Sequence, residues 1–458
     1  MPTTRPSAFN WKSCPADILY LIFKLLSPAE HHTLCLVNQE FRAIAEPLLY
    51  SKIQFTWEKK LHFSGLEAPP PIAQLLETLI SNPQLAAYIK SFRLDGFAWA
   101  AEEARFKHLQ IHIPHDQLKE PVAFIRRSGV PYRDSWSREL CNGSVDALVA
   151  LLLSQLQSLE YLYLGYTFTR QSAFTGLMLR SAVCEPGTYQ LGNFQHLQEL
   201  SFLCLESRDE ACDRNIKNTA AILTFFYLPN LRHMSASIQN LDKWAWPAPY
   251  PPVPSKLKFL DLEIIREGSL GELLAVTKNL ETLRWKWYYD FSVEDDFVTQ
   301  TLDLDQIAAV LSHVRETLTE LTITADCQPG VNGQFFPGLE AVGSLRALDC
   351  TGRDERLQDF MPRNVEFLTI TDDLALQNSD YLEEEWPLWE WKDYAILGLL
   401  RSWLKEWTQC TPHLTRITLL LNWIDTDTNQ WSPRAREQFW HLSTHYGIPL
   451  EFVDTKDR

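Results

Sequence analysis

A short motif, apolar-x-x-apolar-x-apolar, recurs along most of this 458-residue chain. Residues two apart in a strand point to the same face, so each copy predicts a short strand with one buried side. The spacing between copies is irregular, from 20 residues (Leu345 to Val365) to 70 (Ile89 to Leu159). An early copy and ten further copies have these three apolar residues: Tyr50, Ile53, Phe55; Ile89, Phe92, Leu94; Leu159, Leu162, Leu164; Leu197, Leu200, Phe202; Leu231, Met234, Ala236; Leu257, Leu260, Leu262; Leu280, Leu283, Trp285; Leu318, Leu321, Ile323; Leu345, Leu348, Cys350; Val365, Leu368, Ile370; and Leu414, Ile417, Leu419.

Segments with helical patterns lie between many of these motifs. They cover residues 72–80, 145–156, 219–227, 270–276, 304–314 and 394–407, and Ser144 is expected to cap the second. Strands that alternate with helices predict an α/β fold with parallel strands. We expect an irregular solenoid with strands on the concave face and helices outside. A doubly wound sheet is the alternative, but it usually has a glycine-rich turn after its first strand, and no GxGxxG occurs here.

The first part of the chain, residues 14–53, is dense in helix signals. Ser27, Pro28 and Glu30 form the start of a helix with a capping box, and Asn38 can cap the next helix. A unit of about 40 residues is at the limit of independent stability. Its surplus of apolar surface implies a partner, either the rest of the chain or another protein. The first helix has apolar residues at i, i+3, i+4, i+7 and i+8, namely Ile18, Leu21, Ile22, Leu25 and Leu26.

This stretch resembles the F-box family. Two positions depart from the family pattern, since Cys14 replaces a leucine and Asp17 replaces a glutamate. Both changes are mild, because cysteine packs as a small hydrophobe and aspartate keeps the charge. A helical hairpin that caps a larger domain is the alternative interpretation. The matching residues are Pro15, Ile18, Leu19, Ile22, Phe23, Leu26, Pro28, Leu34, Leu36, Val37, Phe41, Arg42, Pro47, Leu49 and Ile53.

The resemblance implies that the first module binds the Skp adaptor of an SCF-type cullin–RING ubiquitin ligase. The motifs that follow are similar to the degenerate leucine-rich repeats found after F-boxes, especially in fungal proteins. The asparagine usual after each repeat strand is mostly absent here, so the turns need other hydrogen-bond partners. The implied adaptor-binding residues are Pro15, Ile18, Leu19, Ile22, Leu36, Val37 and Phe41.

We expect two domains, a helical module over residues 13–54 and a repeat domain over residues 55–458. The repeat domain would carry inserts at about 97–142, 244–255 and 373–393, and a C-terminal cap at about 394–458. The first insert is polar and predicts a long loop. The second contains PAPYPPVP, which predicts a stiff, extended connection. Long inserts in repeat proteins often carry binding functions.

Composition and charge restrict the kinds of partner and the cellular compartment expected for this chain. A net charge of −16 argues against general nucleic-acid binding, which needs a basic surface. Nine scattered cysteines without a CxxC pair favour reduced thiols and a reducing compartment. The first twelve residues hold no apolar signal core, and no apolar run approaches the length of a membrane span. We therefore expect a cytoplasmic or nuclear protein without a membrane partner.

The alternating strand positions that do not face the core would form a target-binding surface. Exposed tyrosine, tryptophan and arginine are the residue types that anchor protein interfaces. The alternative is that many of these side chains are simply solvated. The candidate substrate-binding residues are Tyr161, Tyr163, Phe259, Arg284, Lys286 and Trp287.

The common catalytic and metal-binding motifs are absent from the sequence. The sequence contains no GxxxxGK[ST], HExxH or GxSxG. Histidines 108, 112 and 115, and the pair His441 and His445, lack the further ligands that zinc sites use. We expect no enzymatic activity, cofactor or metal, and a substrate-receptor subunit that binds the Skp adaptor and, through it, cullin. The alternatives are an interaction scaffold that does not direct ubiquitination, and an enzyme whose repeats are misread.

Overall fold

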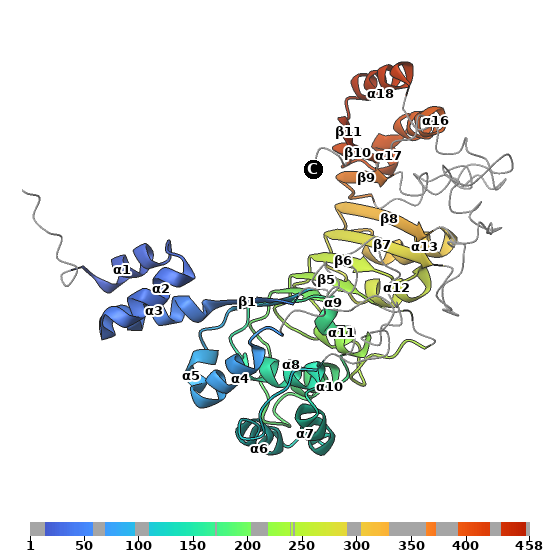
Figure 1. Ribbon diagram of the computed structural model, residues 1–458. Helices are drawn as coiled ribbons and strands as arrows, with labels where there is room; N and C mark the ends of the chain where they lie inside the picture. Colours follow the sequence, from blue (N-terminus) through green and yellow to red (C-terminus); the bar gives the residue numbers. More distant parts are fainter. Residues whose placement is uncertain are drawn as a thin grey trace, which may run out of the picture. The chain divides into compact units, whose positions relative to one another are not determined.

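The computed structural model describes residues 14–57, 69–96, 110–169, 172–202, 219–238, 240, 243–290, 304–328, 363–371, 393–421 and 432–454. Residue contacts divide the chain into two compact units, one of residues 1–168 and 185–197 and one of residues 169–184 and 198–458. Eleven strands occur among the described residues, in the chain order β1 to β11 (Figure 1). The chain therefore has the expected α/β class with parallel strands, and each unit is described by itself.

The first unit begins with three helices and continues with three strands and further helices. Strands β1, β2 and β3 pair in parallel in that order. Its elements are α1 (Ala16–Phe23), α2 (Pro28–Val37), α3 (Gln39–Ser51), β1 (Lys52–Thr56), α4 (Ile72–Ser81), α5 (Pro83–Ala86), β2 (Ser91–Asp95), α6 (Lys119–Ser128), α7 (Arg133–Cys141), α8 (Val145–Gln155) and β3 (Tyr161–Leu164). The short helix α9 (Tyr166–Thr169) follows β3.

The second unit contains the remaining strands, with helices α12 and α13 along one side of β6–β8 (Figure 1). Strands β4 to β11 pair in parallel in chain order. Its elements are α10 (Ala173–Val183), β4 (Glu199–Phe202), α11 (Thr219–Phe225), β5 (His233–Ser237), β6 (Phe259–Glu263), α12 (Glu267–Leu274), β7 (Thr282–Asp290), α13 (Leu304–Leu311), the 3₁₀ helix η3 (Ser312–Val314), β8 (Glu320–Gln328), β9 (Phe367–Thr371), α16 (Asp393–Leu404), α17 (Trp407–Cys410), β10 (Arg416–Leu421), α18 (Pro433–Tyr446) and β11 (Leu450–Asp454).

The apolar motif forms rows of buried side chains across neighbouring strands. In β6, Leu260 and Leu262 are fully buried, and Leu260 pairs in register with Met234 of β5 and Leu283 of β7. The first motif residue, such as Leu257, is buried just before its strand. The predicted strands are confirmed in register within each unit. The copy at Leu345, Leu348 and Cys350 lies outside the described residues.

A repeated backbone contact holds the strands in this register. The carbonyl oxygen of Lys258 accepts hydrogen bonds from the N–H groups of both Glu281 and Thr282, each at 2.9 Å. The carbonyl oxygen of Glu281 in turn accepts from Thr319 and Glu320, at 2.8 and 3.0 Å. Each repeat therefore pairs the residue before its strand, as well as the strand itself, with the next repeat. Such pairing leaves few unsatisfied backbone groups at the turns.

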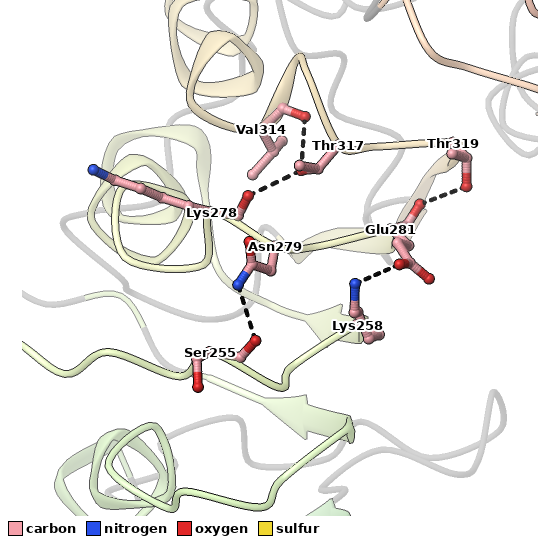
Figure 2. Close-up of polar contacts among 8 residues, drawn as sticks. All are labelled: Ser255, Lys258, Lys278, Asn279, Glu281, Val314, Thr317 and Thr319. Atoms are coloured by element: carbon pink, nitrogen blue, oxygen red, sulfur yellow. Dashed lines mark hydrogen bonds and ion pairs between the residues drawn. The ribbon is translucent and has the colours of Figure 1, made fainter.

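Side chains at the same turns add a second ladder (Figure 2). The residue before the first motif leucine donates to a backbone carbonyl of the preceding repeat: Asn279 Nδ2 to Ser255 O at 2.9 Å, and Thr317 Oγ1 to Lys278 O at 3.1 Å. Asn364 Nδ2 donates to Glu316 O in the same way. These contacts tie the turn before each of these strands to the preceding repeat.

The predicted helices are confirmed, and the described residues also contain helices that were not predicted. The segments at 72–80, 145–156 and 219–227 correspond to α4, α8 and α11, and Ser144 Oγ accepts the Ala147 N–H at 3.4 Å as the expected N-cap. Helices α6 and α7 occupy the insert at 97–142 that was predicted as a loop, and α10 lies in a segment without a prediction. Helix α7 is fixed by few apolar residues, chiefly Trp136, whose Nε1 donates to Ala147 O at 2.9 Å, so its periodic signal is weak.

The predicted domain boundaries differ from the compact units. Strand β1 spans the expected boundary between residues 54 and 55 and pairs with β2, so the helical module is continuous with the sheet of the first unit. The segment at 244–255 has neither helix nor strand, as a stiff connection requires. The expected cap at 394–458 contains β10 and β11, which extend the sheet of the second unit. Most of the insert at 373–393 lies outside the described residues.

Candidate functional site

The helices α1, α2 and α3 enclose a small core of their own. Leu19, Phe23 and Ala45 are buried at its centre, and the Phe23 and Phe41 rings meet edge to face at 5.3 Å. The partly buried residues packed around this centre are Cys14, Ile22, Leu26, Leu34, Cys35, Phe41, Ile44 and Leu48. The module therefore has a buried core of its own, and the helices packed on this core hold the outward-facing side chains in place.

The N-termini of α2 and α3 are capped by side chains, as the sequence predicted. Ser27 Oγ accepts the Glu30 N–H at 3.4 Å, and Glu30 Oε2 accepts the Ser27 N–H at 2.7 Å, which completes the capping box. The hydrogen bonds that the Ser27 N–H and the Ser27 hydroxyl donate to Glu30 Oε2 lower the pKa of the Glu30 carboxyl below its ordinary value. Asn38 Oδ1 accepts the Phe41 N–H at 2.7 Å and starts α3. The caps satisfy backbone N–H groups that lack partners in a helix.

A buried histidine joins α1 to α2. His31 is 7% exposed, and its Nε2 lies 2.7 Å from the carbonyl oxygen of Phe23, at the end of α1. Carbonyl groups in the last turn of a helix have no partner within that helix. The Nε2–H tautomer satisfies one of them and ties the two helices together. The relative placement of α1 and α2 is therefore fixed by a specific hydrogen bond as well as by packing.

The same module leaves a set of large apolar side chains exposed. Leu25 is 86% exposed and Leu36 is 76% exposed, which is unusual for leucines beside an intact core. The set comes from α1, the turn after it and the end of α2. Its members are Ile18, Tyr20, Leu21, Leu25, Leu36 and Val37, and we refer to them as the α1–α2 surface.

The structure sorts the predicted adaptor-binding residues into three groups. Pro15, Ile18, Leu36 and Val37 are exposed. Ile22 and Phe41 are half-buried in contact with the module core. Leu19 is 5% exposed and belongs to that core, so it supports the surface from below and cannot contact a partner directly.

Three exposed residues of the α1–α2 surface were not among the predicted contacts. Tyr20, Leu21 and Leu25 are all exposed. The spacing of Leu21 and Leu25 placed them on the same apolar stripe as Ile22 and Leu26, but only Ile22 and Leu26 pack on the core. The apolar stripe of α1 is wider than the helix face that α3 can cover. This excess width was the feature of the sequence that could have predicted the exposure of Leu21 and Leu25.

In the first unit, the predicted target-binding residues Tyr161 and Tyr163 lie on β3. Tyr161 is 40% exposed. The Arg93 guanidinium lies 3.6 Å from the centre of the Tyr163 ring and pairs with Asp95 at 2.5 Å. A cation over an aromatic face is attracted by the ring quadrupole. These contacts hold Tyr163 and Arg93 in one arrangement on the side of the strands opposite the buried rows.

In the second unit, Phe259, Arg284 and Lys286 lie on neighbouring strands β6 and β7. The Arg284 guanidinium lies 5.2 Å from the Phe259 ring centre and pairs with Glu320 at 3.1 Å. Asp261 lies in register with Arg284, and burial raises the pKa of its carboxyl against the lowering effect of Arg284 and Lys286. The described part of Trp287 is its backbone alone, within β7. Cationic and aromatic side chains therefore do meet on this side of the sheet.

The described residues offer no group of three metal-ligating side chains. His112 and His115 are exposed, and His108 lies outside the described part of the chain. His441 is exposed on α18 and lies 3.9 Å from Glu437. No helix in the described ranges has both the length and the apolar character needed to cross a membrane. Comparison with known protein families and with curated proteins found no match.

Proposed function

We propose that this chain is a substrate-receptor subunit of an SCF-type cullin–RING ubiquitin ligase. In this proposal α1 to α3 form an F-box that binds the Skp adaptor, and the strand-and-helix units form a leucine-rich-repeat-like solenoid that binds a target protein. The observation that carries the proposal is the α1–α2 surface, which stays exposed although the module has its own core.

The chemistry of the α1–α2 surface supports a protein partner. Leu21, Leu25, Leu36 and Val37 are each more than half exposed, which is costly for isolated apolar side chains in water. Large exposed apolar side chains mark sites of association with other proteins, and this small module exposes six of them among its described residues. The capped helix ends and the His31 contact keep these side chains on a rigid frame, so little conformational entropy is lost on binding.

The second part of the proposal assigns target binding to the strand side that carries Tyr163 in the first unit and to the strand side that carries Phe259 and Arg284 in the second, each taken by itself. Aromatic and arginine side chains are the usual anchors of protein interfaces. The subunit itself would perform no bond chemistry. Its contribution would be to hold the target close to the charged conjugating enzyme, which raises the effective concentration of the target lysine.

The test compares two substitutions of exposed leucines on helices. Leu36→Glu alters the α1–α2 surface, and Leu177→Glu, at a position 40% exposed on α10 of the second unit, is the matched control. Full-length chains are expressed in their native cell type and purified by an affinity tag. The native chain and the control should bring down the adaptor and cullin, whereas Leu36→Glu should lose at least about 90% of both, because burying a charge unpaired is costly.

Three results would count against the proposal in different ways. Equal recovery of adaptor with Leu36→Glu would reject the α1–α2 surface. Recovery of the adaptor without cullin would favour the interaction scaffold over the ligase subunit. Absence of the adaptor from the native chain would reject the F-box assignment itself.

A further inference from the structure

His31 is a buried histidine whose two ring nitrogens have different surroundings. Its Nε2 lies 2.7 Å from the Phe23 carbonyl oxygen, and because a carbonyl oxygen only accepts, Nε2 carries the proton of this hydrogen bond. In the neutral ring Nδ1 is then an acceptor, and it is buried without a hydrogen-bond partner. A buried polar atom left unpaired costs stability. The chain thus keeps a side chain with a cost at Nδ1, and the bond from Nε2 is the contact that this side chain provides in return.

The Phe23 carbonyl does not need the histidine to satisfy its own oxygen. That oxygen also accepts the Leu26 N–H at 2.9 Å, in the turn that follows α1. Without His31 it would still have a partner, so the end of α1 would not be left with an orphaned carbonyl. The contribution of the His31 bond is therefore the link that it makes between two helices.

Helices α1 and α2 have few other direct links. Both helices pack on α3, whereas their own backbones come close to each other at few residues. Within residues 14–56, the bond from His31 is the only hydrogen bond that joins α1 to α2. Apolar packing on α3 is non-directional, but a hydrogen bond requires a particular distance and angle. His31 therefore fixes where α2 lies relative to the end of α1.

The α1–α2 surface is divided between these same two helices. A partner that contacts both parts at once requires a set distance between them. Its members on α1 and in the following turn are Ile18, Tyr20, Leu21 and Leu25, and its members on α2 are Leu36 and Val37.

We propose that His31 is a positioning residue for adaptor binding. Its Nε2 hydrogen bond sets the placement of the two parts of the α1–α2 surface relative to each other, and the ring itself, only 7% exposed, does not touch the adaptor. This inference rests on the adaptor-binding role proposed above, and it adds a residue that controls the affinity of that surface from below.

Loss of this hydrogen bond should weaken adaptor binding more than it weakens the fold. Without the bond, the adaptor has to fix α2 against α1 during binding, and such ordering reduces affinity. The usual net contribution of one hydrogen bond corresponds to about threefold to tenfold in affinity. The fold loses the same bond, but it no longer buries the unpaired Nδ1, and Phe23 keeps its Leu26 partner. These effects on stability oppose each other.

The test measures the affinity of the full-length chain for purified Skp adaptor by biolayer interferometry. His31→Leu removes both ring nitrogens and should bind about threefold to tenfold more weakly than the native chain. His31→Gln should bind within about twofold of the native chain, because its side-chain amide can donate to the Phe23 oxygen in place of Nε2. His32→Leu makes the same substitution at the neighbouring exposed histidine and is the matched control, with native affinity expected.

Thermal unfolding of each variant separates positioning from loss of the fold. The unfolding transitions of His31→Leu should lie within about 4 °C of those of the native chain, which is the scale of one hydrogen bond. A much larger drop would show that His31 acts by holding the fold together, and the inference would be overturned.

The binding results separate this inference from the function on which it rests. If the native chain binds the adaptor and His31→Leu binds equally well, the assignment of His31 alone is rejected. The same conclusion follows if His31→Gln binds as weakly as His31→Leu, or if His32→Leu weakens binding as much. If the native chain binds no adaptor, the proposed function is rejected and this inference with it.

Discussion

Asp261 lies in a partly buried position that disfavours the charged form of its carboxyl. It lies at the centre of β6, in register with Ser235 of β5 and Arg284 of β7. Burial raises the pKa of its carboxyl above the ordinary value of 3.8, although Arg284 and Lys286 pull the pKa down. Folded chains bind a proton at Asp261 more tightly than unfolded chains do. Stability therefore falls as the pH rises from 3.8 through the folded-state pKa, and the cost is complete above it.

Asp261→Asn should remove this cost. At pH 7 we expect the free energy of unfolding to rise by on the order of 0.5 kcal/mol, a small value because the half-buried side chain is partly screened by water. Below pH 3.8 the two chains should be equally stable, since the native carboxyl is then protonated. Urea denaturation at both pH values measures the difference. A less stable asparagine variant at pH 7 would mean that attraction from Arg284 and Lys286 outweighs burial.

Side chains in the turns before the strands form a ladder of hydrogen bonds to the preceding repeat. Figure 2 shows how Thr317, Thr319 and Asn279 each reach a backbone carbonyl of the preceding repeat. The sequence predicted only that the turns after the strands need other partners. It did not show this ladder before the strands, because the contacts join positions 24 to 39 residues apart, and their alignment depends on the register of the strands.

Thr317→Val should weaken the junction between β7 and β8. The substitution keeps the shape of the side chain but removes the donor to Lys278 O, so we expect a loss of about 0.5–1.5 kcal/mol in local stability. Thr317→Ser keeps the hydroxyl and is the control. Hydrogen exchange of the Thr319 and Glu320 amides, which donate to Glu281 O, reports this junction. Unchanged exchange in the valine variant would show that the hydroxyl contributes nothing measurable there.

At the scale of the whole molecule, the chain consists of two compact units, each with its own buried rows. Leu162 of β3 belongs to the first unit and is 2% exposed, and Leu260 of β6 belongs to the second and is fully buried. In proteins built from repeated units, stability is close to a sum of local terms and nearest-neighbour contacts. Chains of several compact units also depart from two-state unfolding.

Leu162→Ala and Leu260→Ala should therefore act on different unfolding transitions. Each removes a core leucine at a cost of about 2–5 kcal/mol. Scanning calorimetry of the native chain should resolve two transitions, with Leu162→Ala lowering the temperature of one and Leu260→Ala that of the other. A single transition that both substitutions lower equally would instead show that the two units unfold as one.

Local signals in the sequence determined the parts of this protein that depend on near neighbours. The capping box at Ser27 and Glu30, the cap at Asn38 and the apolar motif of strands such as β6 were all readable, because each depends on residues within a few positions. The repeated motif also predicted parallel strands between helices. Helices α6 and α7 were not readable, because few apolar residues fix them.

Tertiary structure decided which side of each apolar element is covered. Leu21, Ile22, Leu25 and Leu26 look alike in the sequence, yet Ile22 and Leu26 face the core while Leu21 and Leu25 remain exposed. The choice depends on where α3 packs against α1, which periodicity alone does not specify. Covalent geometry and short-range hydrogen bonds follow from residues that are close in the sequence. Burial depends on contacts between segments that only the fold brings together.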